Sequence, residues 1–114
     1  MSSHIVVFMT ASSMDEAAGV ARSMVEARLV ACCNIIPQIR SIYHWQGQIH
    51  DEPEVMMVAK TRQEMLPAII EKVRSMHSYD VPEIVAVPMA GALDSYLSWI
   101  DANVAGPKSA RAEQ

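Results

Sequence analysis

The order of hydrophobic patterns along the chain predicts an α+β fold built around one antiparallel sheet. Two segments each read strand, helix, strand, and 114 residues leave room for a single domain. The composition, 51% hydrophobic and 19% charged, supports one packed core and excludes a disordered protein. We therefore expect one domain over residues 1–105, followed by a flexible polar tail over residues 106–114.

The first segment begins with a strand and continues into a capped helix. Residues 4–10 (HIVVFMT) are β-branched and apolar on both faces, which is typical of a buried strand. Ser13 and Glu16 have the spacing of a capping box, which marks a helix N-terminus. Apolar residues then recur within 17–25 at the spacing of one helical face, so this segment is predicted to be helical.

A long antiparallel hairpin is predicted next. Residues 29–36 are apolar, and Pro37 interrupts them, which places this strand at a sheet edge or at a bulge. Residues 46–48 (QGQ) are a turn signal, and residues 54–61 (EVMMVAKT) read as another strand. Two strands around a short turn are expected to pair with each other.

The second segment repeats the plan of the first. Thr61 and Glu64 have the spacing of a second capping box, so a helix is expected to begin there and to end near His77. Residues 83–88 (EIVAVP) read as a fourth strand, and residues 93–100 as a short terminal helix.

The resulting order, β-α-β-β-α-β with an extra C-terminal helix, is the ferredoxin-like pattern. Right-handed βαβ connections place both main helices on one face of a four-stranded antiparallel sheet. The other face and the edges of the long hairpin then remain uncovered. A small, lightly charged chain with this much apolar surface is expected to associate with copies of itself.

The charge balance and the cysteines limit the classes of function. Nine Lys and Arg against 13 Asp and Glu give a net charge of −4, whereas a nucleic-acid binder needs a basic stripe. No basic run is present to bind an anionic membrane, and residues 1–4 lack the features of a signal peptide. Cys32 and Cys33 are adjacent, which disfavours a disulfide framework. We expect a cytoplasmic protein without nucleic-acid or membrane partners.

Three stretches together resemble the CutA family of divalent-ion tolerance proteins. They are residues 31–37 (ACCNIIP), 41–49 (SIYHWQGQI) and 77–84 (HSYDVPEI), and the similarity runs in order from residue 5 to residue 104. The resemblance implies a ferredoxin-like subunit in a homotrimer similar to the trimeric PII signalling proteins, with hairpins that reach between subunits. It also implies a role in tolerance of copper or other divalent cations. No enzymatic reaction is implied, and the sequence contains none of the common phosphate-binding or hydrolase motifs.

The metal ligands implied by the resemblance are His77, Met9 and Cys32. Imidazole, thioether and thiolate groups all suit copper. Met9 stands where relatives have Cys, and His77 is single where some relatives have a His pair, so copper binding is expected to be weak. Cys32 has a structural alternative as a small buried apolar residue, and His77 one as a cation at a helix C-terminus. Cys33 is expected on the opposite face of the strand from Cys32.

Five further residues, Tyr43, Trp45, Lys60, Tyr79 and Glu83, occupy recurring polar and aromatic positions of the family. The resemblance implies that they converge at clefts between subunits, where PII-like trimers hold small ligands. The alternative function is therefore a PII-like signalling or adaptor module that binds a small ligand or a partner protein. The aromatic residues have a structural alternative as anchors of the hairpin on a neighbouring subunit, and Lys60 and Glu83 one as an ion pair across strands.

Two other groups are better explained by structure than by metal binding. His44 and His50 flank the hairpin turn among acidic residues, but they lack the ligand spacing of a structural zinc site. The nine methionines contain no Met-x-Met or Met-x-x-Met repeat, and most are expected to fill the core.

Overall fold

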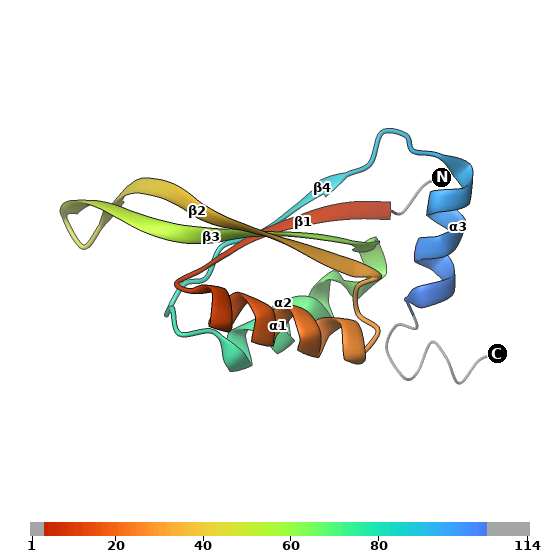
Figure 1. The fold of residues 1–114 in the computed structure, drawn as a ribbon, viewed down its shortest axis with the longest axis horizontal. Coiled ribbons are helices and arrows are strands. Elements are labelled where there is room, and N and C mark those ends of the chain that lie inside the picture. Colours follow the sequence, from red (N-terminus) through yellow and green to blue (C-terminus); the bar gives the residue numbers. More distant parts are fainter. Residues whose placement is uncertain (1–3, 105–114) are drawn as a thin grey trace.

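A computed structural model describes residues 4–104 and has the predicted order of elements (Figure 1). The predicted tail over residues 106–114 lies outside the described residues. The elements are β1 (His4–Ala11), α1 (Met14–Glu26), β2 (Cys32–Trp45), β3 (Gln48–Arg62), a 3-10 turn (Gln63–Met65), α2 (Leu66–Met76), β4 (Ile84–Pro88) and α3 (Asp94–Asn103). The ferredoxin-like prediction with an additional terminal helix is confirmed.

The four strands form one antiparallel sheet in the order β2-β3-β1-β4. Helices α1 and α2 lie side by side along one face of the sheet, and α3 stands at its end (Figure 1). No helix in residues 4–104 combines the length and apolar character needed to cross a membrane.

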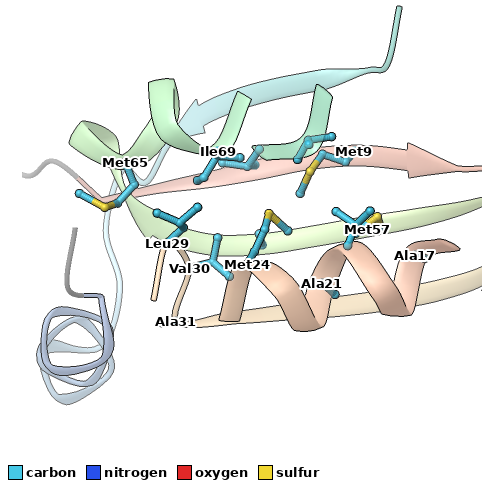
Figure 2. Packing of buried hydrophobic residues seen from close by; sticks show 14 of the residues in the cluster. Met9, Ala17, Ala21, Met24, Leu29, Val30, Ala31, Met57, Met65 and Ile69 are labelled. Atoms are coloured by element: carbon cyan, nitrogen blue, oxygen red, sulfur yellow. The ribbon is translucent and has the colours of Figure 1, made fainter. Parts of the chain in front are cut away.

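Methionines occupy the centre of the core between the sheet and the two helices (Figure 2). Met9, Met24, Met57 and Met65 are each at most 2% exposed, which confirms that most of the central methionines fill the core. A flexible thioether side chain fits the irregular space between a twisted sheet and two helices. Met14 and Met76 are exceptions, because they lie at the start of α1 and at the end of α2 and are 46% and 42% exposed.

Helix α1 begins where the first capping signal predicts. The Ser13 hydroxyl accepts a hydrogen bond from the Glu16 backbone N–H at 3.1 Å. Glu16 Oε1 accepts from both the backbone N–H and the hydroxyl of Ser12, at 2.9 and 2.8 Å. The carboxylate therefore reaches one residue further back than in a capping box, and both ends of the motif are still satisfied.

The second capping prediction is wrong. Thr61 still belongs to β3, and its fully buried hydroxyl donates to the Leu29 carbonyl at 2.6 Å instead of capping a helix. Glu64 accepts from Arg62 Nε at 2.8 Å, and α2 begins only at Leu66, with Pro67 in its first turn. Proline is compatible with the first turn of a helix because the N–H that it lacks has no partner there.

The β2–β3 hairpin projects beyond the helices and gives the molecule its 49 Å length (Figure 1). Gln46 and Gly47 form its two-residue turn, both with positive φ (53° and 79°), as the twist of a hairpin requires. Pro37 was predicted to mark an edge or a bulge, and both are present. β2 is an edge strand, and its register shifts between Ile36 and Ile39.

The sheet face opposite the two helices is apolar and uncovered in the single chain. Residues paired across neighbouring strands lie on the same face, and the register aligns Val87 with Val6 and Val85 with Phe8. Val85 and Val87 are 49% and 43% exposed. Ile36, 47% exposed, extends this face onto β2. The uncovered face predicted from the element order is therefore present.

Candidate functional site

A pocket of about 520 Å³ lies between the outer half of the hairpin and the loop of residues 78–83. It is lined by Thr10, Ser41, Ile42, Tyr43, Trp45, Glu54, Ser78, Tyr79, Asp80, Val81 and Glu83. Four of the five predicted cleft residues, namely Tyr43, Trp45, Tyr79 and Glu83, are therefore brought together within one subunit. The fifth, Lys60, is not among the lining residues.

Lys60 lies further along β3, where it pairs with Val6 and Cys32 in the sheet register. Its ammonium group donates a hydrogen bond to the Asn34 side-chain oxygen. The predicted cross-strand pair of Lys60 with Glu83 is not formed, because Glu83 precedes β4 at the pocket.

The first part of the loop is held by the His77 side chain, which is only 1% exposed. His77 Nδ1 accepts a hydrogen bond from the Tyr79 backbone N–H at 3.1 Å. The imidazole proton therefore lies on Nε2, which donates to the Thr10 carbonyl at 2.7 Å. Both ring nitrogens are occupied, and the side chain joins the loop to the end of β1.

Tyr79 joins the same loop to the hairpin. Its hydroxyl donates to Glu54 Oε2 at 2.6 Å, and its ring lies against the His77 ring with centroids 4.6 Å apart. Burial and the hydrogen bond to Glu54 raise the pKa of the Tyr79 hydroxyl well above its usual range, so it remains a donor at all physiological pH values. The Glu54 carboxylate is thereby oriented at the pocket wall.

Glu16 fastens the loop to the start of α1. Its Oε2 accepts from the Ser78 backbone N–H at 2.7 Å, while Oε1 accepts from Ser12. Burial alone would raise the pKa of Glu16, but the hydrogen bonds from Ser12 and Ser78 outweigh it and lower the pKa from 4.5 to about 2. The spacing of Ser13 and Glu16 predicted that the Glu16 carboxylate bonds at the N-terminus of α1. Nothing in the sequence signals its hydrogen bond to Ser78.

The Glu16→Gln variant is expected to lower the free energy of unfolding at pH 7 by about 1.5–3 kcal/mol, the range for hydrogen bonds to a charged group. The pKa of Glu16 is about 2 in the folded state and 4.5 when unperturbed. The ionised carboxylate therefore stabilises the folded state fully above pH 4.5, and this stabilisation is lost as the pH falls toward 2. Urea unfolding from pH 7 to pH 2.5 should show the two proteins converging in acid. Asp15→Asn, an exposed acid one residue earlier, is the control. A difference that is constant over this pH range would contradict the assignment.

The three predicted metal ligands are not brought together. Met9 is fully buried in the core among the helix-facing side chains, and both nitrogens of His77 are hydrogen-bonded. Cys32 pairs with Lys60 on the opposite sheet face, and its Sγ lies 3.7 Å from the Tyr96 hydroxyl. Within residues 4–104, no three His, Cys, Asp or Glu side chains form a group that could hold a metal ion.

The two cysteines differ in environment, as their alternation along β2 predicts. Cys33 packs against the core on the helix side of the sheet, and burial together with the neighbouring Cys32 raises the pKa of its thiol to about 11. A thiol with this pKa remains protonated at neutral pH and is a poor metal ligand. Cys32 lies on the other face, near Tyr96.

The histidines near the hairpin turn have structural contacts. His50 stacks on Tyr43, with ring centroids 5.3 Å apart and an interplanar angle of 12°, and its Nδ1 lies 3.5 Å from Glu52. His44 is exposed. The stacking supports Tyr43 where it faces the pocket.

Sequence reasoning missed several residues of the pocket. The place of Ser41 at the pocket could have been predicted from strand alternation, since Ser41 lies two residues before Tyr43 on the same strand and therefore points to the same side. Glu54 and Asp80 carry no such signal. Glu54 joins the pocket only because β3 pairs with β2, and Asp80 only because of the path of the loop.

Comparison with known proteins gives a consistent result. The profile of the CutA1 divalent ion tolerance proteins matches residues 5–103. The divalent-cation tolerance protein CutA of Thermus thermophilus is 42% identical over 98 residues, which cover 86% of this chain and 95% of that protein. The crystal structure of CutA from Xylella fastidiosa has a TM-score of 0.87 at 32% identity, and the match covers 90% of this chain and 99% of that one.

Plant and animal relatives are longer. The chloroplastic CutA of Arabidopsis thaliana is 41% identical over 96 residues, which cover 84% of this chain but 53% of that protein. The chain spans about half the length of this relative and of the mouse protein CutA. With the family profile matching nearly all of the described residues, and with the pocket and sheet in place, the chain belongs to the CutA1 family of divalent ion tolerance proteins.

Proposed function

We propose that this member of a divalent-ion tolerance family works as a cytoplasmic homotrimer that binds copper and catalyses no reaction. The observation that carries the assembly is the uncovered apolar sheet face, since Val85 and Val87 on β4 and Ile36 on β2 are exposed there and favour a partner surface. The two free cysteines support a reducing compartment. The imidazole nearest to the pocket hydroxyls is that of His77, next to Thr10 and Ser78, and both of its nitrogens are engaged in other hydrogen bonds, which supports a binding role over an enzymatic one.

Cys32 is the copper ligand that the geometry favours among the three predicted ones. A thiolate binds Cu(I) well, and Cys32 is half-buried on the sheet face away from the helices. Met9 is enclosed in the core, and His77 would have to break a hydrogen bond before either nitrogen could bind a metal. The weak binding expected from the sequence fits a ligand set that is not preassembled within one subunit.

Titration of the reduced protein with Cu(I) against a competing chelator tests this assignment. Cys32→Ser is expected to weaken binding about tenfold or more, equivalent to 1.4 kcal/mol or more, whereas the matched Cys33→Ser variant should bind as the parent does. His77→Ala should loosen the loop but leave copper affinity unchanged. Equal affinities for the parent and Cys32→Ser would reject the ligand, and no binding by the parent would reject copper.

A second function is favoured by the pocket itself. Its volume of about 520 Å³ is that of a small-molecule site, and its walls come from the hairpin and from a loop tied to β1 and α1. A ligand there would connect two elements that otherwise meet through the Tyr79–Glu54 hydrogen bond. We propose that the pocket makes the protein a PII-like module whose hairpin and loop respond to a small ligand.

A further inference from the structure

The charge of the pocket is one-sided. Glu54, Asp80 and Glu83 contribute three carboxylates to its walls, and no lining residue is Lys, Arg or His. The Glu54 charge acts on its surroundings, since it contributes to raising the pKa values of both Tyr79 and Tyr43, after burial as the larger cause. The pocket therefore lies in a negative potential that favours a cationic ligand and disfavours a phosphate or carboxylate.

Three aromatic rings share this space with the carboxylates. Tyr43 and Trp45 are alternate residues of β2 and so point to the same side of the strand, and Tyr79 lines the pocket from the loop. Tyr43 and Trp45 are each 40% exposed, which leaves ring surface accessible. Aromatic faces beside carboxylates attract an organic cation, which gains a cation–π contact as well as an ion pair.

The polar groups are already oriented without a ligand. The Tyr79 hydroxyl donates to Glu54 Oε2 at 2.6 Å, and the stacking of His50 on Tyr43 holds the second ring. Because only Oε2 of Glu54 is engaged in this bond, Oε1 is available to accept from a ligand N–H. Orientation in advance lowers the entropy lost on binding.

A bare metal ion fits this pocket poorly. The carboxylates do not belong to any group of three ligating side chains in residues 4–104 that could hold one ion. The volume of about 520 Å³ also far exceeds what a single ion needs, and it suits a molecule with a carbon skeleton.

We infer that the pocket binds a small organic ammonium ion, with its carbon chain along Tyr43 and Trp45 and its N–H groups on Glu54 and Glu83. This inference rests on the second proposed function, ligand binding at the pocket, and assigns the chemical class of the ligand.

Three four-carbon probes that differ only in charge test it on the assembled protein by isothermal titration calorimetry. They are 1,4-diaminobutane, the neutral butane-1,4-diol and the dianionic butanedioate. The diamine is expected to bind at least ten times more tightly than the diol, and its affinity should fall as the salt concentration rises. Butanedioate is expected not to bind.

Variants locate the site. Trp45→Leu should weaken diamine binding roughly 5- to 30-fold, the loss of one desolvated cation–π contact. Glu83→Gln should weaken it by a similar factor, whereas Glu71→Gln, at an exposed position on α2 outside this pocket, is the matched control and should have no effect. Thermal melting of each variant verifies that it is folded.

The outcomes separate the ligand class from the pocket function. Tighter binding of the diol or of butanedioate than of the diamine, weakened by Trp45→Leu, would keep the pocket function and overturn the ammonium class. Displacement of the diamine by equimolar Mg²⁺ would show a counterion effect and also overturn the class. If none of the probes binds, both the class and the pocket function fail.

Discussion

Replacing Val85 by aspartate is expected to convert the proposed homotrimer into a monomer of 12.6 kDa. Val85 lies on the edge strand β4, opposite Phe8 of β1, on the uncovered apolar sheet face. In the single chain it is 49% exposed, so the charge is tolerated there. In an assembly that covers this face, the carboxylate would be buried without a partner, at a penalty of several kcal/mol in each subunit.

Size-exclusion chromatography with light scattering measures the result, with three times the chain mass expected for the parent. The matched control is Val25→Asp, because Val25 is similarly exposed (41%) but lies on α1, on the other side of the sheet. This control should remain trimeric. A Val85→Asp protein that keeps the parent mass, or a parent that is itself monomeric, would refute assembly through this face.

Shortening Met57 to alanine is expected to lower the free energy of unfolding by about 2–5 kcal/mol, the range for truncating a large buried aliphatic side chain. Met57 is fully buried at the centre of β3, beside Met9 and Ile35 in the register, and it faces the helices (Figure 2). The neighbouring side chains are held by the sheet on one side and by α1 and α2 on the other, so they cannot close the cavity completely.

Chemical denaturation at one fixed subunit concentration is the appropriate measurement, because the stability of an oligomer depends on concentration. Met57→Leu, which preserves volume, should cost less than about 1.5 kcal/mol. Met14→Ala, at a 46% exposed position, should change stability by no more than about 0.5 kcal/mol. A small effect at Met57 with a large loss of copper binding would instead favour methionine as a metal ligand.

The fold was largely predictable because its signals are local. The continuous β-branched, apolar run of β1, the Ser13 cap and the helical face of α1 each depend on residues close in sequence, and the structure confirms them. Pro37 predicted the irregularity of β2 for the same reason, since a residue without an N–H disturbs the ladder wherever the strand lies.

The prediction at Thr61 failed because a tertiary contact outweighed a local one. The Thr61 hydroxyl could either cap a helix or donate a hydrogen bond to a carbonyl that becomes buried on folding. The Leu29 carbonyl lies 32 residues away in sequence, and leaving it unpaired in the core would cost about 1–3 kcal/mol. Nothing in the spacing of Thr61 and Glu64 reveals that requirement.

The sequence by itself therefore determined the order of the elements and the uncovered apolar face, because apolar periodicity and short motifs act over a few neighbouring residues. Four residues of the pocket followed from the resemblance to the CutA family. Only the tertiary structure decided that both nitrogens of His77 are occupied, that Lys60 lies away from the pocket, and that Glu54 joins it. These outcomes depend on strand register and on the path of one loop. Both are set by the packing of segments that are distant in the chain, and that information is not carried by any short stretch of sequence.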